Sequence, residues 1–310
     1  MHSFILFTTS DFGHMAAEYL FDHYEVKAVV TSTPKPKGRH FKLEDINTVK
    51  KAKEKDIPII YIEKSSQIYE KIKDIKVDYF LVVDFAFILK KNVLDLPLKY
   101  PINIHPSILP KYRGPSPLHF QIIDNVKKTG ISLIKMNEFV DSGDILFQLT
   151  FELDEWYTFS KFYDLMQYYT SFAFEIFVKN IELFYPQNQD EKMATYTRKI
   201  EKKDAFIDFQ NEDASIVVGK IKAFEKWPKV KLKIEDDLLV LLDAKIDENI
   251  NIKSGYLSVK EEGIFIGCKD KTISILKLQK AGKNQQNIME FLNGYRKRFY
   301  EKKIDMEPIL

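Results

Sequence analysis

Residues 100–146 read YPINIHPSILPKYRGPSPLHFQIIDNVKKTGISLIKMNEFVDSGDIL, and several of their polar side chains stand where an ordinary fold has no need of them. Asn103 and His105 alternate with isoleucines, so on a β-strand the amide and the imidazole point to the same face. Pro106 has no backbone N–H with which to continue a ladder of hydrogen bonds, so the strand should end there. His105 is therefore expected at a strand end, facing a loop.

A second strand pattern, TGISLIKMN at 129–137, is followed by the acidic turn VDSGD, which carries Asp141 and Asp144. An amide, an imidazole and a carboxylate at the ends of neighbouring strands would form an acid–base site. The intervening segment, SILPKYRGPSP at 107–117, contains three prolines and a glycine. These residues predict a rigid, non-repetitive loop.

Each of these side chains also has an ordinary interpretation. A lone histidine such as His105 is more often structural than catalytic. Asp141 taken singly would cap or close a turn, and Arg113 would be a solvated loop charge. Their combination in one short stretch favours the functional interpretation.

The composition is that of a globular chain with a large core. With 310 residues, of which 45% are hydrophobic and 14% aromatic, the chain is long enough for one large domain and a smaller one. No window approaches the roughly 20 apolar residues of a membrane span, and the N-terminus is expected to form a strand, not a signal peptide. Cys268 is the single cysteine, which excludes a disulfide within the chain and favours the cytoplasm. The six histidines show no metal-ligand spacing, so we expect no metal.

Strand and helix patterns alternate in the first half of the chain. Strand patterns occupy 3–9, 28–33, 57–62 and 79–83, and helical patterns occupy 12–24, 43–55 and 68–75. This alternation predicts an α/β fold with a doubly wound parallel sheet, in which ligands bind beyond the carboxyl ends of the strands. An apolar and aromatic helical pattern at 159–185 indicates a core helix.

The second half of the chain changes character. We expect a catalytic domain over 1–186, a linker over 187–204 and a C-terminal domain over 205–310, where short strand patterns predict a small antiparallel β-barrel. Residues 191–310 carry 24 Lys and Arg against 20 Asp and Glu, a net charge of +4 that leaves −2 for residues 1–190. A basic C-terminal part fits a phosphate-backbone partner, although a lysine-rich surface can also serve solubility alone.

The sequence NIHPSILPKYRG at 103–114, followed by VDSGDIL at 140–146, resembles the catalytic signature of the folate-dependent formyltransferases. The resemblance implies a Rossmann-like catalytic domain in which Asn103, His105 and Asp141 are catalytic. Four later segments, TYTRKIEKKDAFIDF, AFEKWP, LQKAGK and MEFLNGYR, resemble the oligonucleotide-binding-fold (OB-fold) domain of the family's methionyl-tRNA branch. The resemblance therefore runs nearly end to end and implies a role in translation initiation.

The resemblance also implies the ligands and their contacts. The family's formyl donor is 10-formyltetrahydrofolate, and the residues implied to hold it are Phe87, Ile88, Leu89, Ser107, Leu109, Pro110, Val140 and Gly143.

The basic segment TSTPKPKGRHFKLEDIN at 31–47 resembles the family's tRNA-contacting insertion loop, although its composition alone would indicate a solvated surface loop. Lys37, Arg39, Lys42 and Arg113 are then the expected contacts to initiator methionyl-tRNA.

Two loops depart from the family's pattern. Residues 8–12 read TTSDF where Gly-Thr-Pro-x-Phe is usual, so a glycine that permits close backbone approach is missing. Residues 84–87 read DFAF where a Tyr-Gly pair is common. We expect these changes to alter details of the folate and methionine pockets and to leave the reaction class unchanged.

The implied reaction moves a formyl group to the α-amine of methionine esterified to initiator tRNA. The amine attacks the formyl carbon, and negative charge develops on the formyl oxygen. Asn103 and His105 would stabilise that charge, while Asp141 would support the imidazolium and accept the amine proton.

Two alternatives remain open at this point. A sugar-nucleotide N-formyltransferase would use the same folate donor, and a catalytically silent RNA-binding protein could keep the fold. The basic segment and the C-terminal domain favour tRNA over a sugar nucleotide, and the intact trio argues against a silent protein. We expect a monomer.

Overall fold

The computed structural model describes residues 2–34, 36–37, 42–234, 237–280, 282–295 and 300–304. The described chain divides into two units. The first contains the described residues of 1–114, 128–152 and 163–196, and the second contains those of 115–127, 153–162 and 197–310. Two segments from the N-terminal half therefore pack with the C-terminal strands, so the units are not separated by a single cut in the chain.

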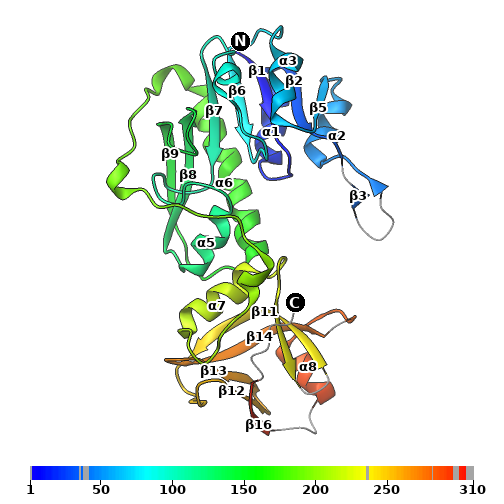
Figure 1. Ribbon diagram of the computed structural model, residues 1–310, viewed down its shortest axis with the longest axis vertical. Helices are drawn as coiled ribbons and strands as arrows, with labels where there is room; N and C mark the ends of the chain where they lie inside the picture. The colour runs from blue at the N-terminus through cyan, green and yellow to red at the C-terminus, as the bar shows by residue number, and fades with distance from the viewer. Residues whose placement is uncertain are drawn as a thin grey trace. The chain divides into compact units, whose positions relative to one another are not determined.

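The first unit is built on a seven-stranded sheet. In spatial order its strands are β5 (Ile59–Ile62), β2 (Glu25–Ser32), β1 (Ser3–Phe7), β6 (Tyr79–Val83), β7 (Tyr100–His105), β8 (Lys128–Lys135) and β9 (Asp144–Glu152) (Figure 1). The first five are parallel, whereas β8 runs antiparallel to β7 and β9 antiparallel to β8. The Rossmann-like parallel sheet predicted from the sequence is thus confirmed, and it is extended at one edge by an antiparallel hairpin.

Helices cover both faces of this sheet because alternate strand residues are apolar on both sides. Ile5 and Phe7 of β1 belong to a buried cluster that includes Ile68 and Val93 from helices on one face. On the other face, Phe4 of β1 contacts Tyr24, which directly follows the helix at 14–23, with ring centroids 5.6 Å apart. The helices of this unit are α1 (His14–His23), α2 (Asn47–Glu54), α3 (Ile68–Ile72), α4 (Lys91–Leu94), most of α6 (Phe159–Lys179), and the short η1 (Ser65–Gln67), η2 (Ile181–Leu183) and η3 (Glu191–Met193).

The basic segment after β2 forms a small hairpin. Its two strands, β3 (Pro36–Lys37) and β4 (Lys42–Leu43), pair antiparallel with Lys37 opposite Lys42. Arg39 lies outside the described residues, and only the backbone of the two lysines is described.

The second unit contains a curled antiparallel sheet, as the sequence predicted. Its strands run in the order β10 (Val230–Ile234), β11 (Asp237–Asp247), β14 (Thr272–Lys280), β13 (Gly263–Gly267), β12 (Tyr256–Lys260) and β16 (Tyr300–Lys303), and β15 (Gln285–Asn287) pairs with β14. Its helices are α5 (Pro117–Ile123), α7 (Ala214–Ala223), α8 (Ile288–Tyr295) and η4 (Lys202–Ala205).

Close packing joins α5 to the C-terminal part of the chain. A Cβ added at Gly219 of α7 would lie 2.5 Å from the carbonyl oxygen of Ile123, so only glycine allows the two helices to approach this closely. The indole N–H of Trp156 donates to the carbonyl of Ile122 at 2.7 Å. These contacts explain why residues 115–127 and 153–162 belong to the second unit.

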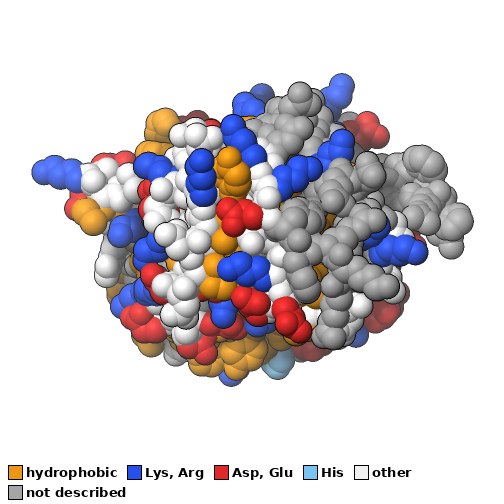
Figure 2. Space-filling view, turned by 90° about the horizontal axis from the view of Figure 1, so that it is seen from below, with side chains coloured by type: hydrophobic (Ala, Val, Ile, Leu, Met, Phe, Trp, Pro, Cys, Tyr) orange, Lys and Arg blue, Asp and Glu red, His pale blue; other side chains and the backbone are white. Residues whose placement is uncertain are grey.

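The surface of the second unit carries charges of both signs. Figure 2 shows lysine and arginine side chains interspersed with acidic and hydrophobic ones. Several of its lysines are paired, for example Lys220 with Glu212 at 2.5 Å and Lys271 with Glu248 at 2.8 Å. The net positive charge of this part is therefore spread over a mixed surface.

Within the described ranges, no helix combines the length and the apolar composition that crossing a membrane requires.

Candidate active site

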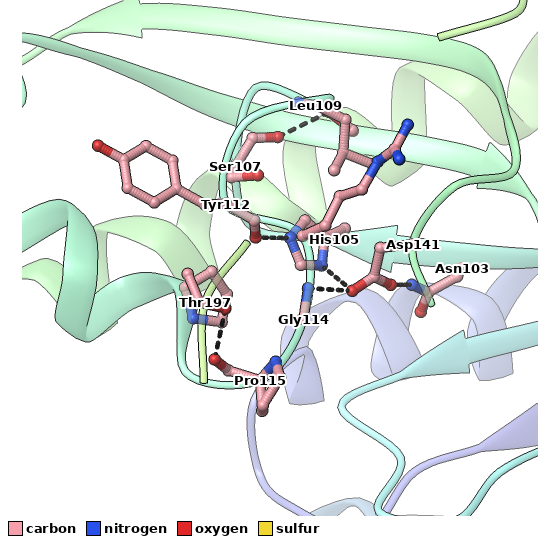
Figure 3. Close-up of polar contacts among 12 residues, drawn as sticks. Asn103, His105, Ser107, Leu109, Tyr112, Gly114, Pro115, Asp141 and Thr197 are labelled. Carbon is pink, nitrogen blue, oxygen red and sulfur yellow. Dashed lines mark hydrogen bonds and ion pairs between the residues drawn. The ribbon is translucent and has the colours of Figure 1, made fainter. Parts of the chain in front are cut away.

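Strand β7 brings two of the three predicted catalytic side chains to one face. Asn103 and His105 are two residues apart on this strand, which lies between β6 and β8. His105 is only 4% exposed, and its Nε2 lies 2.8 Å from the carbonyl oxygen of Tyr112 (Figure 3). A carbonyl oxygen can only accept a hydrogen bond. Nε2 therefore carries a hydrogen and donates a hydrogen bond to the carbonyl of Tyr112. The ring orientation is thereby fixed by the loop that follows the strand.

The third predicted residue, Asp141, lies at the centre of the site (Figure 3). Its Oδ1 accepts a hydrogen bond from Nδ2 of Asn103 at 3.2 Å, and its Oδ2 accepts from the backbone N–H of Gly114 at 2.8 Å. Its Oδ2 also lies 3.5 Å from Nδ1 of His105. The carboxylate therefore contacts the strand, the loop and the imidazole at once.

Asp141 does not reach this position in the way the sequence analysis expected, which was from a strand that ends beside the end of β7. Because β8 is antiparallel to β7, its C-terminal residue Lys135 pairs with Ile102 and not with His105. The turn at 136–143 must therefore fold back towards His105. Asp141 adopts φ 48° in this turn, and a Cβ at Gly143 would lie 1.9 Å from the carbonyl oxygen of Lys135. The glycine is needed for that close approach.

A buried polar cluster holds the loop between the two strands. Ser132, opposite His105 on β8, is 0% exposed. Its Oγ donates to the carbonyl of Ser107 at 2.6 Å and accepts the N–H of Leu109 at 3.1 Å. The amide of Gln148 donates to this same Oγ and to the carbonyl of Leu109, each at 2.9 Å. Sequence reasoning missed Ser132 and Gln148, although a serine inside an apolar strand was a signal that could have found them.

Arg113 is buried. Its side chain is 1% exposed, although the sequence alone suggested a solvated charge and the resemblance a tRNA contact. Its guanidinium donates to both carboxylate oxygens of Glu191, at 2.7 and 2.9 Å, and to the hydroxyl of Tyr196 at 3.1 Å. The hydrogen bonds to Arg113 lower the pKa of Glu191, and those to Glu191 raise the pKa of Arg113. In this structure the cation faces residues 191–196 of the same chain, so a tRNA phosphate could meet it only if these bonds were broken.

The residues predicted to hold the folate fall into two groups. Ile88 and Val140 are exposed, at 74% and 62%, and Phe139 beside them in sequence is 76% exposed. Exposed apolar side chains on the loops after β6 and β8 are free to cover an aromatic ligand. Phe87 is half-buried against the core, and Pro110 is also partly exposed.

The second group is held inside the protein. Leu89 is 6% exposed, Leu109 2% and Ser107 0%, and the hydroxyl of Ser107 donates to the carbonyl of Lys111 at 2.7 Å. Gly143 offers only backbone, as described above. These residues can shape the pocket wall, but their side chains are committed to the protein interior.

The two loops that depart from the family's pattern are bonded to each other. The N–H and the hydroxyl of Thr9 both donate to the carbonyl of Asp84, at 3.1 and 3.0 Å, and the hydroxyl of Ser10 donates to its carboxylate. Asp84 adopts φ 46°, a conformation that favours glycine but that aspartate tolerates. The polar residues of the first loop thus stabilise the strained residue of the second.

The exit of the basic hairpin is anchored to the first loop. The carboxylate of Asp11 accepts the backbone N–H of Asn47, the first residue of α2, at 2.7 Å. Asp45 accepts from Lys53 at 2.6 Å and from the hydroxyl of Tyr61 at 2.7 Å. The hairpin therefore starts and ends on fixed elements of the first unit.

Among the residues that the structure describes, no group of three His, Cys, Asp or Glu side chains could hold a metal ion. The single cysteine, Cys268, is buried in the second unit, and burial raises its pKa to about 12. Thiolate chemistry at this residue is therefore disfavoured.

Comparison with protein families gives two matches that together span most of the chain. Residues 4–174 match the family described as formyl transferase, and residues 199–296 match the formyl transferase C-terminal domain.

Named relatives match over nearly their full length. The methionyl-tRNA formyltransferase of Ehrlichia canis is 34% identical over 302 residues, which are 94% of this chain and 96% of that protein. The methionyl-tRNA formyltransferase of Clostridium acetobutylicum is 30% identical over 304 residues, which are 95% of this chain and 97% of that protein.

Two solved structures share the fold. Methionyl-tRNA formyltransferase from Clostridium thermocellum has a TM-score of 0.56 at 21% identity, covering 81% of this chain and 96% of that one. An N-formyltransferase from Helicobacter canadensis, in complex with folinic acid and dTDP-3-aminofucose, has a TM-score of 0.69 at 19% identity, covering 90% of this chain and 100% of that one. At these identities the likeness shows the fold alone.

Proposed function

Because this chain belongs to the methionyl-tRNA formyltransferase family, we propose that it transfers a formyl group from 10-formyltetrahydrofolate to the α-amine of methionyl-initiator-tRNA. The observation that carries the proposal is the end-to-end match: both formyl transferase domains are present in the family's order, and the named relatives match over at least 94% of this chain. The enzyme is a transferase, and the product serves translation initiation. We place the protein in the cytoplasm on that basis.

The folate donor supplies the formyl group, whose carbon forms a bond to the amine nitrogen as its bond to the folate nitrogen breaks. The incoming amine must lose a proton, and the departing folate nitrogen must gain one. Charge also develops on the formyl oxygen. The chain therefore has to supply a proton acceptor, a proton donor and a hydrogen-bond donor to oxygen.

Asp141 is the proposed proton acceptor. Its side chain is 16% exposed, compared with 5% for His105, so it is the more accessible of this pair. A proton taken by Oδ2 can move to Nδ1 of His105, 3.5 Å away, because Nε2 is occupied by its bond to Tyr112. The aspartate and the histidine thus form a short path along which the proton is held and returned.

Asn103 is the proposed donor to the formyl oxygen. Its amide nitrogen has two hydrogens, of which one is directed at Asp141, so the second can meet the developing charge. His105 was expected to share this task. In this structure both of its ring nitrogens face other partners, and it could contact the oxygen only by giving up one of them.

The exposed apolar residues Ile88, Phe139 and Val140 would cover the donor's ring system, with Phe87 behind them. They fit this task because large exposed apolar side chains on two loops next to a polar cluster are typical of a ligand pocket. Leu89, Ser107, Leu109, Pro110 and Gly143 would act by holding the wall in place.

The basic hairpin is the proposed contact to the acceptor RNA. Lys37, Arg39 and Lys42 would neutralise backbone phosphates, an interaction that needs charge and not a fixed geometry. Arg113 is better understood as a part of the scaffold, because its buried guanidinium is already held by Glu191 and Tyr196.

The test is a formylation assay with purified protein, the folate donor and methionyl-tRNA. We expect formylmethionyl-tRNA to form, and uncharged tRNA to inhibit weakly. An amino-sugar nucleotide is offered in parallel, because the alternative acceptor would use the same donor. Formylation of the sugar nucleotide alone would overturn the proposal.

A further inference from the structure

Residues 187–196, which we call the strap, lie along the active-site turn. Gln187 and Ile145 exchange two backbone hydrogen bonds, of 2.7 and 2.9 Å, at the start of β9. Further along, the N–H of Thr195 donates to the carbonyl of Pro110 at 3.2 Å, and its carbonyl accepts the N–H of Arg113 at 2.9 Å. The strap is thus bonded at one end to the start of β9 and at the other to the loop after β7.

Between these anchors, the side chain of Gln189 is bonded at both ends. Its Nε2 donates to the carbonyl oxygens of Asp141 and Gly143, at 2.9 and 2.7 Å. Its Oε1 accepts from Nε and Nη2 of Arg113, at 3.0 and 2.8 Å. A single amide therefore joins the backbone of the catalytic turn to a buried cation.

The orientation of this amide follows from its partners. A guanidinium has only donors, so the atom that faces Arg113 must be the oxygen. Asp141 and Gly143 offer only carbonyl oxygens, so the atom that faces them must be the nitrogen. Arg113 is itself held by the ion pair with Glu191, so the amide of Gln189 has a single orientation that satisfies its partners.

The turn needs such support because its backbone is unfavourable. Asp141 adopts φ 48°, a left-handed conformation that residues other than glycine adopt at a cost in energy. Such a residue persists only where its surroundings over-determine it. The two hydrogen bonds from Gln189 act on the carbonyls of Asp141 and Gly143, so they hold the peptide unit that directly follows Asp141 and the end of the turn.

We propose that Gln189 is a positioning residue for catalysis, which holds the Asp141 carboxylate in contact with Asn103, His105 and the N–H of Gly114. The proposal rests on the proposed function for the role of Asp141 in the reaction. Gln189 itself does not touch the reacting groups. It acts through the turn, and Arg113 acts through Gln189.

The test removes the Nε2 hydrogen-bond donor of Gln189 and keeps the shape of the side chain. Gln189→Glu retains an oxygen for Arg113 but turns the Nε2 donor into a second oxygen facing two carbonyls, so the turn loses its support. We expect kcat to fall by about ten- to a hundredfold, since a displacement of about 1 Å can cost on the order of 10² in rate. The KM for the folate donor should stay within about threefold, because the apolar wall of the pocket is unchanged.

Gln187→Glu is the matched control. It introduces the same charge on the strap two residues away, at a position where only the backbone is hydrogen-bonded to other described residues, and kcat should be unchanged. Gln189→Met, which is of similar length and uncharged, replaces the first variant if thermal melting shows that Gln189→Glu does not fold.

Two further readouts separate positioning from a merely structural role. In an Asp141→Asn background, Gln189→Glu should cause no further loss of kcat, whereas a general effect on the fold would lower kcat by the same factor in both backgrounds. Hydrogen exchange over 137–143 should be faster in Gln189→Glu than in Gln187→Glu. If exchange and kcat match the control, the positioning role is overturned. If the wild-type protein itself does not formylate methionyl-tRNA, the proposed function fails, and hydrogen exchange still decides whether Gln189 holds the turn.

Discussion

The backbone N–H of Gly114 donates to the carboxylate of Asp141 at 2.8 Å, although the two residues are 27 positions apart in the chain. This bond joins the loop after β7 to the turn after β8. The side chain of Ser132 on β8 is hydrogen-bonded to the loop, and the side chain of Gln189 on the strap is hydrogen-bonded to the turn. The carboxylate of Asp141 thus lies where the loop after β7 meets the turn after β8.

We predict that Asn103→Ala, His105→Ala and Asp141→Asn each lower kcat at least about a hundredfold, because each removes a hydrogen-bond or proton partner at the reacting groups. Formylation rates and thermal melting curves check this result. Ser142→Ala is the control, since its hydroxyl donates to Oδ1 of Asn137, which is outside the trio. Near-normal turnover by a folded His105→Ala protein would contradict the assignment.

Ser132→Ala should destabilise the protein by about 1–3 kcal/mol, because it leaves the carbonyl of Ser107 and the N–H of Leu109 without their partner in a buried place. Chemical denaturation measures the free energy of unfolding. The comparison is Ser160→Ala, a serine of α6 whose buried hydroxyl has no hydrogen-bond partner within the described ranges. Equal effects of the two substitutions would show that the polar cluster contributes nothing to stability.

His119 should make the protein sensitive to acid. Its ring stacks on Phe159 with centroids 4.4 Å apart, its Nδ1 is buried without a hydrogen-bond partner among the described residues, and burial lowers its pKa to about 4. The unfolded chain would bind this proton near pH 6.5, so between pH 6.5 and 4 the unfolded state holds more protons. The free energy of unfolding should therefore fall as the pH drops through this window, by on the order of 3 kcal/mol.

The variant that tests this dependence is His119→Phe, which keeps an aromatic ring and removes the titration. Its free energy of unfolding should lose most of the change between pH 6.5 and 4, while the exposed His23→Phe control keeps it. An unchanged pH profile in His119→Phe would show that other groups cause the acid sensitivity.

Removing the charge of Arg39, or of Lys37 and Lys42 together, should weaken the binding of methionyl-tRNA and leave folate binding within about twofold. Each phosphate contact that is lost should also lower the slope of log affinity against log salt concentration by about 0.7–0.9. Filter binding at several salt concentrations measures both. Lys50→Ala, an exposed lysine of α2, serves as the control. An equal loss of folate affinity would place the hairpin at the donor site instead.

The sequence by itself determined the elements and the chemistry. The alternation of Asn103 and His105 with isoleucines sets a strand with two polar residues on one face, because side chains on a strand alternate with a period of two. The apolar strand patterns and the intervening helices likewise determined the parallel sheet. These are local properties, so they can be read from neighbouring residues.

Only the tertiary structure decided which way the last two strands run and what holds the site together. An antiparallel β8 and a parallel one have the same apolar pattern, so the sequence could not show that the turn with Asp141 must fold back from Ile102 towards His105.

Arg113 illustrates the same limit for a charged side chain. Its sequence neighbours are polar loop residues, and its partners, Gln189, Glu191 and Tyr196, are 76 to 83 positions away. Whether such a cation meets solvent, RNA or the chain's own carboxylate depends on long-range packing, because burial and pairing are set by residues that are distant in the chain. The sequence named three candidate catalytic side chains, and the fold alone supplied the strap that we propose holds one of them, Asp141, in place.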